Sequence, residues 1–324
     1  MAQLVEKLKK LRIPIIFRPF LFLLVAVGLF SALSPYFFTI QNFKALATSS
    51  AILMILSVGG ALVILTGMVD LGLESVLAAT TVVVTVLNIV YALPAWISIT
   101  AALAMGIFVG LINGLLVTKL KIPSFIATLG MYWGMRGVAL VISKGYPIAS
   151  TSVKPPRPIT FDWLAGKING IPTMFIIALI VIIIAQIFVS NFKKGTEIYA
   201  IGGNEAAART TGINVDSTKI LVFIISGFLA ALAGVLVAAW LRTGYAWTAQ
   251  GFSLKAIAAI VLGGVPFVGG YGTLIGAGIG AIIIAMISDI LVLLGVSPTY
   301  DYIAIAAVLI IAGLQTRRET GLVK

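Results

Sequence analysis

The sequence predicts an all-α membrane protein that crosses the bilayer about ten times. Of its 324 residues, 60% are hydrophobic and only 10% are charged, which is more apolar surface than a water-soluble domain can bury. Long apolar runs recur along the chain, separated by charged residues, prolines and glycines. Because about 20 apolar residues let a helix cross the hydrocarbon layer, we expect one polytopic transmembrane domain over residues 1–324.

Ten apolar runs meet or approach the length of a spanning helix, although several are short. In chain order they are residues 20–38, 45–65, 75–92, 94–117, 125–143, 172–189, 220–240, 254–266, 273–294 and 302–314. The first run follows a basic segment, as in a secretory signal, but Pro35 comes directly after the small residues Ala32 and Ser34 and disfavours cleavage. We expect an uncleaved first helix behind a cytoplasmic segment, residues 1–18.

The positions of Lys and Arg favour a cytoplasmic location for both termini. With the N-terminus inside, the inside connections hold fourteen basic residues and the outside connections hold six, which agrees with the positive-inside rule. Residues 144–171 then form an outside loop, whose prolines and glycines are typical of an ordered surface segment. That loop is either part of a docking surface or a solvated connector, and residues 190–219 face the cytoplasm.

Composition excludes several classes of function. The chain has no cysteine, no histidine and only ten acidic residues, so it lacks the commonest general base and the commonest metal ligands. We expect no catalytic residues, no metal site and no bound cofactor. The net charge of +12 comes from basic residues at the ends of apolar runs, which membrane topology explains better than nucleic-acid binding.

Two stretches interrupt the helical pattern at membrane depth. The first, "SVGGALVILTGMVDLGLESVLAATT", places Asp70 and Glu74 between apolar runs, and the second, "LGGVPFVGGYGTLIGAGIGAIIIA", has eight glycines from Gly263 to Gly280. Irregular backbone is tolerated in a bilayer only where protein or a water-filled cavity surrounds it, and paired broken segments indicate a transport path. The glycines can also serve helix packing, and the two roles are compatible.

Polar residues at membrane depth are candidates for such a path, because each costs free energy in hydrocarbon. They are Asp70, Glu74, Asn88, Asn113, Arg136 and Asp289. Simpler roles are open for three of them. Arg136 can form an ion pair with Asp70 or Glu74, Asp70 can cap the helix that follows it, and Asn113 can hydrogen-bond across a helix interface.

A polar stretch, "IGGNEAAARTTGINVDSTK", has the start and stop signals of a short helix. Asn204 is a strong N-cap, Glu205 places a carboxylate at the positive end of the helix dipole, and Gly212 is suited to end the helix. Asp216 or Ser217 can then cap the next helix. About two turns are unstable alone in water, so we expect this helix to rest in a partner's groove or on its own bundle.

The polar stretch and the helix after it resemble part of the ribose-type sugar permeases of ATP-binding cassette (ABC) importers: "GGNEAAARTTGINVDSTKILVFIISGFLAALAGVL". The segment "TGMVDLGLESVLA" is similar to the "GGIDLSVGS" segment of that family. Four further segments match it in the same order: "GLINGLLVTKLKIPSFIATLG", "SKGYPI", "AIAAIVLGGVPFVGGYGTLIGAGIGA" and "LLGVSPTYDYIAIAAVLIIA". The resemblance covers nearly the whole chain after the first span.

The resemblance implies a permease subunit in the cytoplasmic (inner) membrane that translocates a monosaccharide such as ribose. Its partners would be ABC ATPase subunits, a periplasmic or lipid-tethered sugar-binding protein and a second permease subunit. The chain has no G-x-x-x-x-G-K-[ST] phosphate loop, so we expect ATP on the partner subunits. The residues that would form the ATPase-coupling loop are Asn204, Glu205, Ala206, Ala207, Arg209 and Gly212.

Departures from the family leave some points open. Glu74 stands where glycine is common and Asp289 where asparagine is frequent, so the substrate or the subunit pairing can differ from the ribose type. The glycine of the coupling loop is offset by one residue, which leaves its ATPase contacts open. Related permeases carry nucleosides, autoinducers and branched-chain amino acids, and an ion-coupled transporter using Asp70, Glu74 and Asp289 is the alternative of another class.

Overall fold

The structure, a computed structural model, describes residues 18–319. Seven helices in this part are long and apolar enough to cross a membrane. They are α3 (Ile40–Leu65), α4 (Leu73–Thr85) with its π-helical continuation η2 (Val86–Val90), α5 (Ala95–Thr118), α6 (Ser124–Ser143), α7 (Thr173–Asn191), α10 (Val215–Leu241) and α12 (Leu274–Leu293). The all-α polytopic class is therefore confirmed, while the expected segment 1–18 lies almost entirely outside the described residues.

The other three expected runs are also helical, but their apolar parts are shorter. They correspond to α2 (Arg18–Leu33), α11 (Phe252–Leu262) and α13 (Asp301–Glu319), which is apolar over Asp301–Ile310. The run expected over 254–266 is helical only to Leu262, where a glycine-rich loop begins. Ten crossings therefore remain a prediction.

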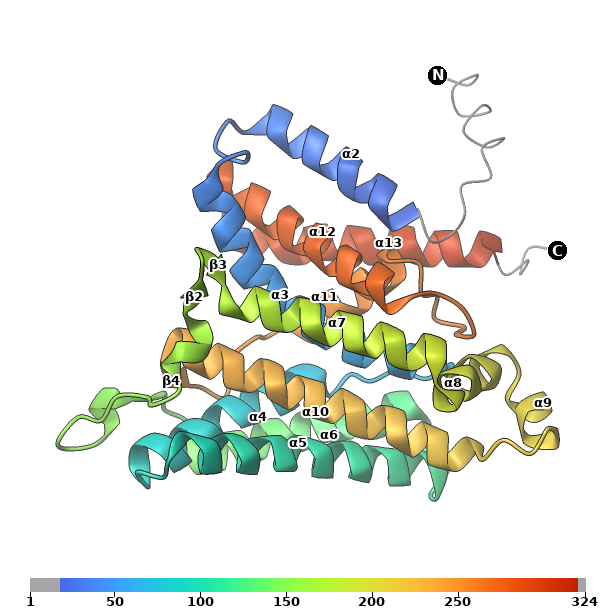
Figure 1. The fold of residues 1–324 in the computed structure, drawn as a ribbon, viewed down its shortest axis with the longest axis horizontal. Coiled ribbons are helices and arrows are strands. Elements are labelled where there is room, and N and C mark those ends of the chain that lie inside the picture. Colours follow the sequence, from blue (N-terminus) through green and yellow to red (C-terminus); the bar gives the residue numbers. More distant parts are fainter. Residues whose placement is uncertain (1–17, 320–324) are drawn as a thin grey trace.

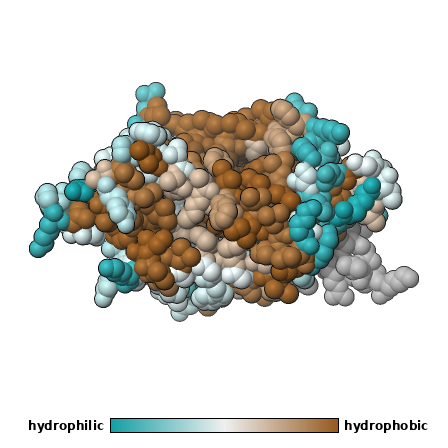
Figure 2. All heavy atoms as spheres, turned by 90° about the horizontal axis from the view of Figure 1, so that it is seen from below, coloured by the Kyte–Doolittle hydropathy of each residue, from teal (hydrophilic) through white to brown (hydrophobic). Residues whose placement is uncertain are grey.

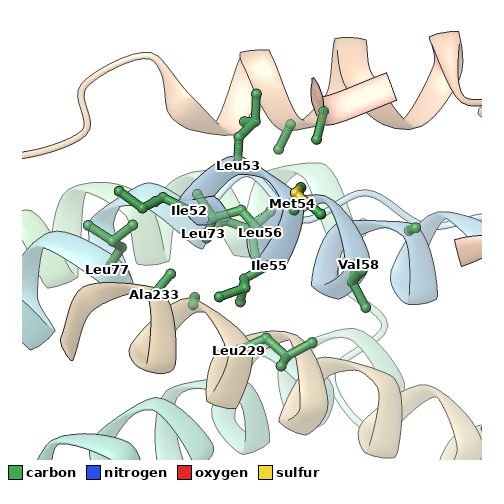
Figure 3. Close-up of a cluster of buried hydrophobic side chains, with 14 of the residues drawn as sticks. Ile52, Leu53, Met54, Ile55, Leu56, Val58, Leu73, Leu77, Leu229 and Ala233 are labelled. Carbon is green, nitrogen blue, oxygen red and sulfur yellow. The ribbon is translucent and has the colours of Figure 1, made fainter. Parts of the chain in front are cut away.

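Helix α3 forms the centre of the bundle. Of its most apolar window, 89% is buried inside the protein, against 28% for α5, α6 and α7. A helix that is hydrophobic on all sides is stable at the centre of a bundle, and α3 packs against α7, α10, α11 and α12. Figure 3 shows its side chains, including Ile55, between those of Leu77 on α4 and Leu229 on α10.

Helices α5 and α10 approach through glycine. Gly106, Gly110 and Gly114 recur every four residues on α5, and an added Cβ on any of them would strike the backbone of α10. On α10, Gly227 meets the backbone of α5 in the same way. Such small-residue faces let helices pack closely where no hydrophobic effect draws them together.

The glycine-rich stretch packs α11 against α12. An added Cβ on Gly276 would meet the carbonyl of Gly263, and one on Gly280 would meet the carbonyl of Ala259. The packing role expected for the glycines of this stretch is therefore confirmed at Gly276 and Gly280. A role for the stretch in lining a transport path stays a prediction.

The loop over residues 144–171 is ordered and does not span, while its outside location stays a prediction. It contains β1 (Ile148–Ala149), the 3-10 turns η3 (Ser150–Ser152) and η4 (Asp162–Ala165), and β2 (Lys167–Ile168), which pairs with β3 (Ile171–Pro172). Strand β1 pairs with β4 (Thr243–Gly244), which follows α10. Phe161 is fully buried and anchors the loop on the bundle, as expected for an ordered surface segment.

The two ends of the bundle are polar and its sides are apolar. Figure 1 shows the loop with β2 and β3 at one end and the short helices α8 (Lys193–Gly203) and α9 (Glu205–Thr210) at the other. The start of α2 lies at the α8 and α9 end, as does the end of α13 (Figure 1). On the face drawn in Figure 2, hydrophobic residues form a belt between hydrophilic ends, as a bilayer requires.

Candidate functional site

Two helices begin inside the bundle and meet N-terminus to N-terminus. Helix α4 follows a non-helical segment, residues 66–72, and α11 follows another, residues 245–251. The backbone N–H of Glu74 donates to Ser253 Oγ over 3.1 Å, and the N–H of Ser253 donates to Glu74 Oε2 over 3.1 Å. Each residue therefore caps the other's helix, satisfying backbone donors that a helix start leaves unpaired.

This junction lies near the middle of the bilayer. Arg136, which contacts Glu74, comes twelve residues after Ser124, the first residue of α6 (124 to 136). At about 1.5 Å per residue this is about 18 Å along the helix, and the hydrocarbon layer is about 30 Å thick. Non-helical backbone at such a depth is tolerated because protein surrounds it.

Arg136 fixes the junction from α6. Its Nη2 lies 2.8 Å from Glu74 Oε1, both side chains being almost wholly buried, and its Nη1 donates to the Ala246 carbonyl over 2.5 Å. The guanidinium carbon lies 5.2 Å from the ring centres of both Tyr132 and Trp247, a geometry that favours cation–π attraction. The expected ion pair is confirmed, with Glu74 rather than Asp70 as the partner.

Asp70 does not cap a helix. Its Oδ1 accepts from the N–H of Gly72, the residue before α4, and its Oδ2 accepts from Ser226 Oγ on α10 over 2.7 Å. The carboxylate therefore closes the turn before the helix and ties that turn to α10. The capping role considered for it belongs instead to Ser253, which the sequence did not single out.

The remaining candidates lie apart from the junction. Asn88 donates to the Leu93 carbonyl and exchanges two hydrogen bonds with Thr160, which attaches the loop over residues 144–171 to η2, the continuation of α4. Asp289 Oδ2 accepts from Asn42 on α3. Asn113 is buried, and its Oδ1 has no hydrogen-bond partner among the described residues, so the inter-helix bond expected for it is not formed by this oxygen.

Only Glu74 and Arg136, of the six candidates, contact each other through a hydrogen bond or ion pair in the described chain. The sequence did not indicate the polar residues that surround them, because Tyr132, Gln250 and Ser253 are ordinary residues of their segments. One signal was available. The run at 254–266 is too short to span, which predicts a helix that begins inside the membrane.

Two cavities flank the first turn of α11. The junction cavity, of about 300 Å³, is lined by residues that include Glu74, Tyr132, Gln250, Ser253, Leu254 and Tyr302. The outer cavity, of about 510 Å³, is lined by residues that include Ser49, Trp240, Phe252, Lys255, Ser288 and Asp289. Lys255 is paired with Asp301 of α13 and hydrogen-bonded to Ser288. The bundle therefore contains a cavity on each side of one helix start, and each has charged side chains within a mostly apolar lining.

At the polar end of the bundle, the expected short helix forms as α9. Asn204 Oδ1 accepts from the N–H of Ala207, and Gly212 has a φ of 82° in the left-handed region, so both end signals are confirmed. The helix has six residues, fewer than two turns. The next helix, α10, is capped by Asn214, which accepts from Ser217 N–H, and not by Asp216 or Ser217.

One side of α9 rests on its own chain and the other is free. Ala208 is buried against Ile201 and Val215, whereas Ala206 and Ala207 are exposed. The inner side of the helix therefore rests on its own bundle, as one of the two expectations has it. The outer side presents a small exposed surface.

Ion pairs hold α9 against the start of α10. Glu205 lies 2.9 Å from Arg209 and 2.6 Å from Lys219, and Arg209 lies 2.8 Å from Asp216. Asp216 also lies 3.7 to 3.9 Å from the two lysines of segment 119–121. The hydrogen bond from Lys219 lowers the pKa of Glu205. This carboxylate is therefore charged at neutral pH.

Comparison with known proteins gives the family. Residues 42–313 match a family model described as the permease component of a branched-chain amino acid transport system. The chain belongs to this permease family. Together with its seven apolar helices, the match makes it a multi-pass protein of the cytoplasmic membrane, whose family members are transport components.

The permease is similar to several curated import permeases. It is 39% identical over 299 residues to the ribose import permease protein RbsC of Escherichia coli K12, covering 92% of each chain. It is 37% identical to the autoinducer 2 import system permease protein LsrC of Enterobacter sp. 638, over 85% of this chain and 78% of the relative. It is 38% identical to the fructose import permease protein FruF of Bifidobacterium longum, over 76% of this chain and 69% of the relative.

Helix α8 connects α9 of the permease to the centre of the bundle. Gly202 is so close to the Leu65 carbonyl and to Gly270 that no Cβ fits there, and the Tyr199 hydroxyl donates to the Gly272 carbonyl over 2.9 Å. Gly270 N–H in turn donates to Leu65, the last residue of α3. Helix α8 therefore links α9 by direct contacts to the end of α3 and to the loop between α11 and α12.

Proposed function

We propose that this permease carries a monosaccharide, ribose or a similar pentose, into the cell as the membrane subunit of an ABC importer. The observation that carries the proposal is the 39% identity to the ribose import permease along 92% of both chains. The fructose permease, at 38% identity, supports a monosaccharide as the class of substrate. The whole chain, residues 1–324, serves as one permease domain.

The proposed ATPase contact is the free side of α9. Ala206 and Ala207 are exposed there, and small side chains let a partner's backbone approach closely. Asn204 and Gly212 define the two ends of the helix, while Glu205 and Arg209 hold it on α10. In this proposal residues 190–219 form the coupling loop, and ATP is bound and hydrolysed by the partner subunits.

The proposed topology has ten helices that cross or enter the bilayer, with both termini in the cytoplasm. The distribution of Lys and Arg supports it. So does the position of the described ends of α2 and α13, which lie at the same end of the bundle as α9 (Figure 1). Residues 144–171 then face outward and offer a docking surface for a periplasmic or lipid-tethered sugar-binding protein.

The proposed path passes the junction of α4 and α11. Glu74 and Arg136 are the charged residues nearest to it, and the two half-helices resemble the broken helices that line substrate sites in other transporters. Asp70, Asn113 and Asp289 would support the walls, and Asn88 would hold the outer loop. A second permease subunit, identical or related, is proposed to cover part of the exposed apolar surface.

Other cargoes remain alternatives within the same class. The relative from Enterobacter is named for autoinducer 2 and the family description names branched-chain amino acids, while nucleosides are a further option. An ion-coupled transporter would use Asp70, Glu74 and Asp289 as ion ligands. Each of these carboxylates already accepts hydrogen bonds from the protein, which argues against the ion-coupled alternative.

Copurification with the products of neighbouring genes tests the proposal. We expect an ATPase to copurify and to hydrolyse ATP faster when binding protein loaded with D-ribose is added, and reconstituted vesicles to accumulate the sugar. A panel of D-fructose, a nucleoside, autoinducer 2 and leucine identifies the cargo if D-ribose has no effect. Uptake that needs no ATPase and collapses with an ionophore would refute the importer.

A further inference from the structure

The junction cavity contains polar groups that the hydrogen bonds around it do not exhaust. Glu74 Oε1 accepts from Arg136 and Oε2 accepts from Ser253, and each carboxylate oxygen has two acceptor positions. The Gln250 amide and the Tyr302 hydroxyl line the same space. A cavity that opens on the flank of the bundle, beside the junction, is therefore lined by a carboxylate, an amide and two phenol side chains that can contact one small ligand.

We propose that the junction cavity is a binding site for one neutral sugar molecule, at which the cargo pauses halfway across the membrane. This inference rests on the proposed function and names the residues that contact the sugar. Gln250, Tyr132 and Tyr302, together with the free acceptor positions of Glu74, are the contacts. None of the three uncharged residues stands out in the sequence.

The size of the cavity supports a single sugar ring. Its volume of about 300 Å³ lies at the lower limit of ligand pockets, which run from about 300 to 1,000 Å³. Gly251 keeps this space open, because it has a φ of 85° and Tyr302 Cε1 would lie 3.3 Å from any Cβ added to it. The ring of Tyr302 therefore lies over the backbone at the start of α11 and forms one wall.

The charges around the cavity favour a neutral ligand. Helix N-termini attract anions, but here Ser253 Oγ already accepts from the backbone at the start of α4, and the Glu74 carboxylate accepts from the backbone at the start of α11. That carboxylate would repel an anion such as a sugar phosphate. Arg136 and the positive ends of the two helix dipoles would repel a cation. A polyol supplies both hydrogen-bond donors and acceptors without charge, which matches carboxylate, amide and hydroxyl groups together.

The outer cavity is the natural competitor and has a different character. It is larger, about 510 Å³, and its cation, Lys255, is already paired with Asp301 of α13. Asp289 is likewise engaged by Asn42. Ser49 lines this cavity and is exposed, so it provides a matched position for comparison with Gln250.

The absence of cysteine from the chain makes labelling of single introduced thiols a direct test. The variant Gln250→Cys reports on the junction cavity, Leu254→Cys is a second reporter there, and Ser49→Cys reports on the outer cavity. Each variant is assembled with its ATPase subunits in proteoliposomes and treated with a small thiosulfonate reagent at increasing D-ribose concentrations. Uptake by the unsubstituted complex is measured first, with D-ribose or with whichever sugar it transports.

We expect the transported sugar to slow labelling at Gln250→Cys or Leu254→Cys by a factor of one plus its concentration over Kd, about tenfold at ten times Kd. Labelling at Ser49→Cys should not change, and the 5-phosphate of the same sugar should protect neither site. Protection at Ser49→Cys alone would overturn the proposal in favour of the outer cavity. Transport without protection at either junction reporter would overturn the site but leave the importer, whereas no uptake of any sugar would refute the proposed function itself.

Discussion

Glu74 and Ser253, 179 residues apart in the chain, cap each other's helices over two hydrogen bonds of 3.1 Å. Arg136 holds the same carboxylate from a third helix. Because the two half-helices, α4 and α11, start from this one point, a change there affects both broken segments together.

Loss of the Glu74 charge should destabilise the permease more than loss of the Ser253 hydroxyl. Glu74→Gln leaves Arg136 buried without a counter-charge, which costs about 3–5 kcal/mol. Ser253→Ala leaves buried backbone groups unpaired, at about 1–3 kcal/mol. Thermal unfolding in detergent, followed by the fluorescence of the five tryptophans, gives the order of the two variants.

The double variant Glu74→Gln, Arg136→Met is the control for this ion pair. It removes both charges, so its unfolding temperature should lie above that of Glu74→Gln alone, since contacting residues are not additive. If the double variant unfolds at the temperature given by the sum of the single effects, the two side chains act independently and the junction is not a unit.

Gly202→Ala should displace α8 from its contact with the end of α3 and reduce the stimulation of ATP hydrolysis by loaded binding protein. A Cβ at this position would meet the Leu65 carbonyl and the backbone of Gly270, and forced overpacking costs about 1–3 kcal/mol. The neighbouring Gly203→Ala is the matched control, because nothing described lies within 4 Å of its Cβ. Equal stimulation of ATP hydrolysis by loaded binding protein in both variants would show that this contact transmits nothing.

Gly110→Ala should prevent close packing of α5 on α10. The added Cβ would lie 2.8 Å from the Cα of Ile224 and even closer to the Phe223 carbonyl, so we expect loss of about 1–3 kcal/mol and poor yield of folded protein. Gly134→Ala on α6 has open space around it and should be neutral or slightly stabilising. Yield and monodispersity in size-exclusion chromatography compare the two, and equal behaviour would contradict the assigned seam.

A bulky residue on the free side of α9 should block ATPase contact without unfolding the bundle. Ala206→Trp adds volume to an exposed position, so we expect normal thermal unfolding but loss of copurifying ATPase. Thr196→Trp, exposed on α8 at the same end, is the control and should keep the ATPase. Loss of the ATPase in both variants, or in neither, would remove the docking role from α9.

The attachment of α9 should be insensitive to pH near neutrality and weaken in acid. The pKa of Glu205 is lowered in the folded protein, so the stabilisation from its ion pairs is complete above the ordinary carboxyl pKa of about 4. It is lost as pH falls through the lowered pKa. A nitroxide on Ala206→Cys should show constant mobility from about pH 5 to 8 and rising mobility below about pH 4.

Salt provides an independent check on the same attachment. Arg209 and Glu205 are substantially exposed, so screening should raise the mobility of the nitroxide at molar salt. The variant Asp216→Asn, which removes the acceptor shared by Arg209 and segment 119–121, should show that mobility already at low salt. A label that is equally mobile in the parent and in this variant would mean that the ion pairs do not hold α9.

Local signals in the sequence determined the helices and the ends of α9. Apolar runs of sufficient length become helices in a bilayer because the backbone must satisfy its own hydrogen bonds there, and every expected run contains a helix. Asn204 and Gly212 act within three or four residues of themselves, so their roles were readable. That a buried Arg136 requires a carboxylate partner was likewise predictable from the cost of an unpaired charge.

Only the tertiary structure decided which groups meet. Asp70 and Glu74 lie four residues apart, so the sequence alone makes them equivalent as partners for Arg136. The packing of α6 against α4 decides between them, because it places Glu74 Oε1 2.8 Å from Arg136 Nη2. Ser253 became a cap because α11 begins where α4 begins, and neither helix carries a local signal for the other. Contacts across 179 residues depend on how whole helices pack, and periodicity and capping rules describe only the residues within a turn or two.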